Sequence, residues 1–233
     1  MAINFIGDYY NRKELKLLFQ AVKGKRIEFA IIMAAYYGLR RSEILGLKWN
    51  AVDFYYDTIT INHTVSDCSI DGKFTRIAKD RTKSQKSIRT LPLVNSVKEI
   101  LIKMKEAEKL NILNFGNGYK NEYEGYVYKD DIGDLVKPGF VTQNFSQMCE
   151  KAGLKHIRFH DLRHTAATNM HELTGDFYTV GQVLGHSLKG IGIQLQLSNN
   201  LEAVTAQYVD VRLERKLIVL DRYHKEVMGE AKE

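Results

Sequence analysis

The spacing of apolar residues changes period along the chain, and this change limits the fold more than any other feature. Apolar side chains recur at helical intervals in residues 11–22 and again from residue 95 onward. Between these stretches, residues 58–65 alternate apolar and polar side chains as a strand does, and two further short strand patterns follow a turn-rich stretch. The sequence therefore predicts an α+β fold that is mostly α-helical, with one small antiparallel β-sheet.

Individual elements can be assigned from the same patterns. Asn11 is a candidate N-cap for the first helix, and the second is apolar on most sides and so expected to be buried. Residues 111–139, rich in Asn, Gly, Asp and Tyr, are expected to form a long loop. Helices are expected at 11–22, 26–37, 40–47, 95–110, 140–152, 160–173, 177–185, 200–208 and 212–227, and strands at 58–65, 73–79 and 87–91.

The last predicted helix has an apolar stripe of its own. Leu213, Leu217, Leu220 and Val227 lie near one face of residues 212–227, with charged residues over much of the rest. A terminal helix of this kind either folds back on its own core or docks on a neighbouring subunit. The expected division is one domain over residues 1–210 and a tail helix over residues 211–233.

Composition excludes several classes of protein. The 233 residues are 44% apolar, which is enough for a core. The longest nearly apolar run, residues 29–39, is far shorter than the roughly 18 residues that a membrane-spanning helix needs, and the N-terminus lacks the apolar stretch of a secretory signal. Cys68 and Cys149 match no metal-ligand spacing. A cytoplasmic protein without a disulfide framework or membrane span is expected.

Nearly all of the excess positive charge lies in one short segment. The chain has 34 Lys and Arg against 28 acidic residues, a formal net charge of +6. Residues 71–89 alone hold seven basic and two acidic residues. Such a concentration is expected on a surface that meets phosphate backbones, although a solvated hairpin has the same composition. The residues predicted to contact DNA are Lys73, Arg76, Lys79, Arg81, Lys86 and Arg89.

Residues 160–164, HDLRH, put two histidines and an arginine on one helical face. His160 and His164 resemble the zinc-binding HExxH arrangement, with Asp161 in place of glutamate. Aspartate is one methylene shorter, however, and Arg163 would put a fixed positive charge beside a dication. Alternatively, His160 transfers protons and Arg163 clamps a phosphate. Histidines that only cap the helix or face water are a third possibility.

Four other stretches could carry chemistry. GLRRSE, at residues 38–43, puts an arginine just before a helix, where free backbone N–H groups favour an anion, and its glutamate can fix the guanidinium. TKS (82–84) lies in the basic hairpin, and LGHS (184–187) and TAQYV (205–209) follow. Each stretch is weak evidence by itself.

In this order, the stretches resemble the catalytic domain of the tyrosine recombinase (phage integrase) family, from about Asn11 to Tyr208. YGLRRSEILGLKW resembles the first arginine box, TKSQKSIRTLPL the hairpin lysine, FHDLRHTAAT the histidine–arginine box and VLGHS the second histidine. The resemblance implies the catalytic-domain fold of that family. It also implies a site-specific recombinase that cleaves and rejoins double-stranded DNA through a 3′-phosphotyrosine intermediate, without metal, cofactor or ATP. The same resemblance implies that the protein integrates or excises a mobile element or phage and that it acts as a homotetramer on DNA.

The resemblance assigns the phosphate-binding residues. Arg40 and Arg163 match the two arginines that clamp the scissile phosphate, and Glu43 matches the acid that supports the first. Arg40 is preferred to Arg41 because the box has its arginine directly after Gly-Leu and its glutamate three residues later.

The remaining roles follow in the same way. Lys83 matches the lysine that protonates the leaving 5′ oxygen, and His160 matches the general acid/base. His186 matches the second hydrogen-bonding position, and Tyr208 matches the nucleophile. About twice the usual number of residues separates His186 from Tyr208, so residues 188–199 are expected to be an insertion.

Two alternatives stay open. One is a zinc-dependent hydrolase that uses His160 and His164, and the other is a DNA-binding module without catalysis. The catalytic-domain pattern already begins by residue 11, without the family's usual N-terminal DNA-clamping domain. The chain is therefore expected to be either a fragment of a longer integrase or a naturally short one.

Overall fold

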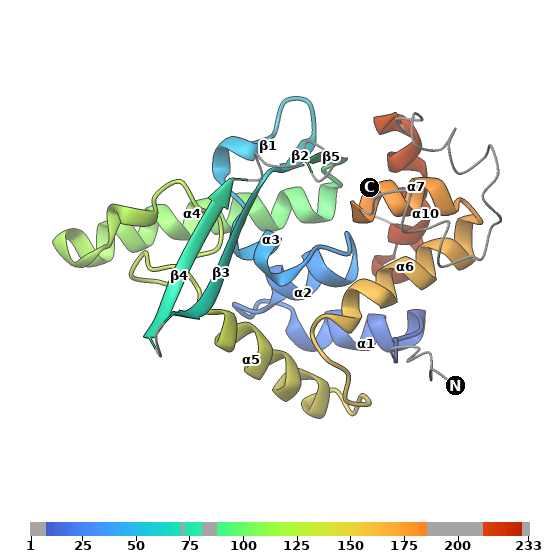
Figure 1. The fold of residues 1–233 in the computed structure, drawn as a ribbon, viewed down its shortest axis with the longest axis horizontal. Helices are drawn as coiled ribbons and strands as arrows, with labels where there is room; N and C mark the ends of the chain where they lie inside the picture. The colour runs from blue at the N-terminus through green and yellow to red at the C-terminus, as the bar shows by residue number, and fades with distance from the viewer. Residues whose placement is uncertain (1–7, 71–72, 81–87, 186–211, 230–233) are drawn as a thin grey trace.

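The computed structural model describes residues 8–70, 73–80, 88–185 and 212–229 (Figure 1). The predicted helix over 200–208, the possible insertion at 188–199, and the candidate residues Lys83, His186 and Tyr208 lie outside these residues.

Helices make up most of the described chain, as the periodicity predicts. None of the described helices has both the length and the apolar composition that crossing a membrane requires. The α-helices are α1 (Arg12–Val22), α2 (Glu28–Ala35), α3 (Arg41–Leu45), α4 (Asn95–Phe115), α5 (Pro138–Lys151), α6 (Asp161–Thr174), α7 (Phe177–Leu184) and α10 (Leu213–Met228), and the short 3₁₀ helices are η1 (Trp49–Ala51), η3 (Gly116–Gly118) and η4 (Asn121–Tyr123).

The strands form two small antiparallel sheets, where the sequence predicted one. β1 (Val52–Asp53), β2 (Thr58–Ile61) and β5 (Arg89–Pro92) make a sheet in the order β1-β2-β5. β3 (His63–Ile70) and β4 (Lys73–Asp80) form a separate two-stranded ribbon. The predicted strand over 58–65 is thus divided between the two sheets, because its first half pairs with β5 and its second half pairs with β4.

The core surrounds α2. Its residues from Phe29 to Ala35 are all buried, as expected for a helix that is apolar on every side. α1 packs against it and begins with the predicted cap: Asn11 accepts hydrogen bonds from the backbone N–H groups of Lys13 and Glu14, and the Glu14 side chain accepts one from the Asn11 N–H.

The predicted loop over 111–139 is shorter than expected. α4 continues to Phe115, and α5 already begins at Pro138. Between them the chain is held to α4 by the carboxylate of Glu108, which accepts hydrogen bonds from Tyr119, at 3.5 Å, and from Lys129. A polar segment that sequence patterns assign to a loop is therefore fixed by a network of hydrogen bonds to one helix.

The tail helix α10 packs on the core of its own chain. It lies against α1, α6, α7 and β5, and Figure 1 shows it behind α6 and α7. Tyr223 is fully buried, stacks on Tyr36 with ring centroids 5.5 Å apart, and donates a hydrogen bond of 2.8 Å to the carbonyl of Ala35. Of the two expected arrangements, the described structure has the intramolecular one, so docking on a neighbour would require α10 to leave these contacts.

Candidate active site

A tight turn places the first arginine box. Gly38 has a φ of +66°, and a Cβ at this position would lie 2.2 Å from Leu184 Cδ2, so a side chain is excluded there. The turn ends α2 and lets α3 begin at Arg41, with Arg40 as its N-cap residue. Arg40 Nη1 donates to Glu43 Oε1 at 2.9 Å, and the Arg40 backbone N–H donates to Glu43 Oε2 at 2.9 Å.

Glu43 is a buried carboxylate that two arginines share. Its side chain is 0% exposed, and besides Arg40 it accepts hydrogen bonds from Arg89 at 3.0 and 3.3 Å. Burial alone would raise the pKa of Glu43. The charge and hydrogen bonds of Arg89, together with the backbone N–H and charge of Arg40, outweigh burial and lower the pKa to about 2. Glu43 is therefore ionised at neutral pH, and it fixes a guanidinium whose side chain remains 35% exposed.

Arg163 lies deeper than a surface phosphate clamp would. It is 4% exposed, and it donates 2.6 Å and 2.8 Å hydrogen bonds to the carbonyls of Gly38 and Leu184. Gly38 is the first residue of the GLRRSE stretch, and Leu184 is the first residue of the LGHS stretch. Both carbonyls therefore belong to stretches that the sequence analysis identified as candidates for chemistry. Arg163 thus joins three segments that are distant in the sequence, and it carries a fixed charge to the centre of the candidate site.

His160 stands at the start of α6, as its N-cap residue, and its side chain is exposed. Its ring centroid lies 5.9 Å from that of His164, with the planes nearly perpendicular. Burial lowers the pKa of His160, and the charges of His164, Arg163 and Arg40 lower it further against the opposing effect of Asp161. A neutral imidazole beside two guanidinium groups can accept a proton while the arginines hold an anion.

The carboxylate next to the histidines is already engaged. Asp161 is buried, and it accepts hydrogen bonds from the backbone N–H, Nε and Nη2 of Arg158 at 2.8, 3.1 and 2.8 Å. It is therefore not placed as the glutamate of an HExxH site would be. Within the part of the chain that the structure describes, no three His, Cys, Asp or Glu side chains cluster as metal ligands.

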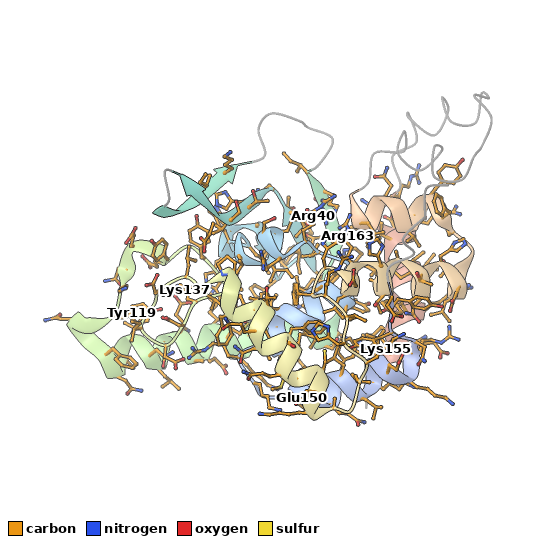
Figure 2. The ribbon with its side chains drawn as sticks, turned by 60° about the horizontal axis from the view of Figure 1, so that its bottom comes forward. Arg40, Tyr119, Lys137, Glu150, Lys155 and Arg163 are labelled. Carbon is orange, nitrogen blue, oxygen red and sulfur yellow. The ribbon has the colours of Figure 1, made fainter. Side chains whose placement is uncertain are left out.

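Arg40 and His160 border an open groove of about 490 Å³. Its walls come from α3, the β3 strand, the start of α5 and the segment before α6. Figure 2 shows the labelled Arg40 and Arg163 close together in the middle of the molecule. The basic and imidazole side chains along the groove are Arg40, Arg41, Arg158 and His160.

The residues of the basic segment, residues 71–89, have different surroundings. Lys79 lies on β4 with its side chain exposed, and Lys73 and Arg76 belong to the same strand. Arg81 and Lys86, like Lys83, lie outside the described residues. The expectation for Arg89 needs correction, because it is 5% exposed and its guanidinium is engaged with Glu43 and with the carbonyl of Val183 at 2.8 Å.

Two partners of the site were not identified from the sequence. One is Arg158, which holds Asp161, and the other is Arg89 in its role as partner of Glu43. For Arg89 a signal existed, since strand alternation puts it on the same face as Leu91, which is buried. No comparable pattern marks Arg158.

Two held guanidinium groups, a buried carboxylate and an imidazole thus lie together, and Arg40 and His160 border an open groove with further basic side chains. The sequence profile of the phage integrase family matches residues 9–191, and this chain belongs to that family. It is 31% identical over 183 residues to a tyrosine recombinase XerC-like protein of Caldanaerobacter subterraneus, covering 76% of this chain and 47% of the relative. To the ICEBs1 integrase of Bacillus subtilis it is 26% identical, covering 64% of this chain and 38% of that protein. The chain thus spans about half or less of the length of these relatives.

Solved structures share the fold. The Tn1549 transposon integrase in complex with transposon right end DNA aligns with a TM-score of 0.65 at 16% identity, covering 88% of this chain and 66% of that one. The XerA recombinase aligns with a TM-score of 0.57 at 19% identity, covering 95% and 66%. The mostly helical α+β fold predicted from the sequence, with two small antiparallel sheets in place of the one expected, is therefore the fold of tyrosine recombinase catalytic domains.

Proposed function

We propose that this chain is the catalytic part of a site-specific DNA recombinase, which cleaves and rejoins strands through a 3′-phosphotyrosine at Tyr208. The observation that carries the proposal is the arrangement of four side chains: Arg40 and His160 line the groove, buried Glu43 holds Arg40, and buried Arg163 lies close enough to His160 for its charge to lower the pKa of that imidazole. Membership of the phage integrase family supports it.

The chemistry suits these groups. A phosphodiester resists nucleophilic attack because its oxygens already carry negative charge. The fixed guanidinium groups of Arg40 and Arg163 would neutralise the further charge that develops at a five-coordinate phosphorus. His160, neutral because its pKa is lowered, would accept the proton of the attacking tyrosine. In this proposal Lys83 protonates the leaving 5′ oxygen, and His186 donates a hydrogen bond to the phosphate.

A covalent tyrosine link keeps the energy of the broken bond, so the strand can be rejoined without ATP. We further propose double-stranded DNA in the cytoplasm as the substrate and a homotetramer as the active assembly. The names of the ICEBs1 and Tn1549 relatives favour integration or excision of a mobile element. A zinc-dependent hydrolase has less support, since Asp161 is held by Arg158.

The experiment that tests this function is covalent trapping. A randomised duplex library selected for binding supplies the DNA site, and a nicked version of that site in EDTA is the substrate. We expect a denaturant-resistant complex, with mass spectrometry locating the DNA adduct on Tyr208. Tyr208→Phe is the matched control and should give no complex. Binding without any covalent product would favour a DNA-binding module, and activity lost in EDTA together with bound zinc would favour the hydrolase.

The basic segment gives a second prediction. Changing Lys73, Lys79 and Lys86 to Gln should flatten the dependence of DNA affinity on salt, because each phosphate contact contributes roughly 0.9 to the slope of log K against log salt. The control changes Lys13, Lys16 and Lys23 to Gln, an equal charge removed from exposed positions that do not line the groove. Titrations at several salt concentrations measure both slopes. Equal slopes in the two triple variants would make the segment a solvated hairpin.

A further inference from the structure

Arg89 connects two segments that the proposed reaction uses. Its Nη1 and Nη2 atoms donate to the two carboxylate oxygens of Glu43, at 3.3 and 3.0 Å, and its Nε donates to the carbonyl of Val183 at 2.8 Å. The side chain is 4% exposed and is not among the residues that line the groove. One guanidinium therefore joins β5 to α3 and to the end of α7.

The carboxylate of Glu43 is shared atom by atom. Oε1 accepts from Nη1 of Arg40 at 2.9 Å and from Nη1 of Arg89 at 3.3 Å. Oε2 accepts from the backbone N–H of Arg40 at 2.9 Å and from Nη2 of Arg89 at 3.0 Å. Because the fork of Arg89 meets both oxygens, it fixes the rotation of the carboxylate, and that rotation sets where the Arg40 guanidinium is held.

Close packing also fixes the guanidinium of Arg89. Gly185 ends α7 with a φ of +71°, and a Cβ at this position would lie 2.7 Å from Arg89 Nη1. The guanidinium thus lies against backbone that has no side chain. Arg163 donates to the carbonyl of Leu184, the residue after Val183, so two buried arginines hold successive carbonyls at the end of α7.

We propose that Arg89 is a positioning residue for strand cleavage, which acts through Glu43 to hold the Arg40 guanidinium in the orientation that binds the scissile phosphate. This inference rests on the proposed function. It changes the role expected of Arg89 from DNA contact to support of the reacting groups. Lysine cannot replace it, since an ammonium group cannot meet both oxygens of Glu43 and the carbonyl of Val183 together.

The test compares Arg89→Lys with the wild-type chain on the selected DNA site. DNA affinity should stay unchanged, because Arg89 does not line the groove. Single-turnover cleavage of the saturated complex should fall about 10²-fold, the effect expected when a reacting group is misplaced by about 1 Å. Ile31→Val, a buried change in α2 at a residue that does not line the groove, controls for lower stability and should cleave normally when folded.

Two combined variants test whether Arg89 acts through Glu43 and Arg40. In an Arg40→Lys background, Arg89→Lys should cause little further loss, because the group it positions is already changed. Glu43→Gln with Arg89→Met removes both charges of the buried pair, which keeps the variant foldable even where Arg89→Lys is not. That variant should cleave at the rate of Glu43→Gln alone.

The outcomes separate the two proposals. Normal cleavage by folded Arg89→Lys would overturn the positioning role while leaving the proposed function intact. The same follows if the loss of cleavage rate in either combined variant equals the product of the losses in its two single variants. A wild-type chain that never forms a covalent complex with the selected DNA would instead count against the proposed function itself.

Discussion

Arg40→Lys should fold and bind DNA like the wild-type chain but cleave it about 10²–10³ times more slowly, the loss typical of removing one preorganised donor. Its side chain borders the groove and is 35% exposed, so the substitution leaves the core unchanged. Lysine keeps the positive charge but loses the planar fork that contacts Glu43 and that, in the proposed function, would also bind a phosphate. Single-turnover cleavage, with affinity and thermal unfolding measured on the same samples, checks the expectation.

Arg163→Lys should behave differently, although the sequence gives both arginines the same role. Lysine would leave at least one of the buried carbonyls of Gly38 and Leu184 without its present partner, and an unsatisfied buried polar group costs about 1–3 kcal/mol. Cleavage should therefore fall together with the free energy of unfolding.

Arg41→Lys is a matched control for both variants. Arg41 also borders the groove, but it donates to Thr142 Oγ1 at 2.6 Å and is not one of the two arginines described above as holding Glu43, so its substitution should slow cleavage far less. If the single variants Arg40→Lys and Arg163→Lys both cleaved DNA at a near-normal rate, neither residue would belong to the proposed phosphate site.

The difference between these two arginines shows what local pattern can predict. Apolar periodicity placed the described α-helices, but not the short 3₁₀ helices, to within a few residues and identified α2 as buried, because both depend on neighbours along the chain. The depth of Arg163 also has a local signal: it shares a helical face with Ala166 and Met170, which are buried. The partners of Arg163 could not be predicted, since the carbonyls it meets belong to turns that are 125 and 21 residues away.

The sheets show the same limit. Residues 58–65 alternate without a break, yet the chain leaves one sheet after Ile61 and enters another at His63. Pairing with β5 or β4 decides where the division falls, and strand pairing is a contact between distant segments. For the candidate site, the motifs locate Arg40, Glu43, His160 and Arg163, but charge counting alone could not distinguish the buried Arg89 from the exposed Lys79 of the same basic segment.

The tail helix gives the largest expected effect on stability. Tyr223→Ala should lower the free energy of unfolding by about 3–5 kcal/mol, the range for removing a large buried aromatic side chain. Tyr223→Phe keeps the ring on Tyr36 and loses only the hydrogen bond to Ala35, so it should cost about 1 kcal/mol. Leu217→Ala, on the exposed face of the same helix, is the matched control and should change little.

Deleting residues 212–233 should be still more disruptive, because it also removes Val219, Leu220 and Val227 from the core. A domain is usually stable by only about 5–15 kcal/mol, so the truncated chain is expected to unfold and not to remain as a core that merely assembles poorly. Urea unfolding of the point variants and circular dichroism of the truncation measure these effects. A truncated chain with a wild-type unfolding midpoint would show that α10 is free to leave the core, as docking on a neighbouring subunit requires. Because the ring of Tyr223 is buried, the partner subunit would have to provide an equivalent apolar surface for it.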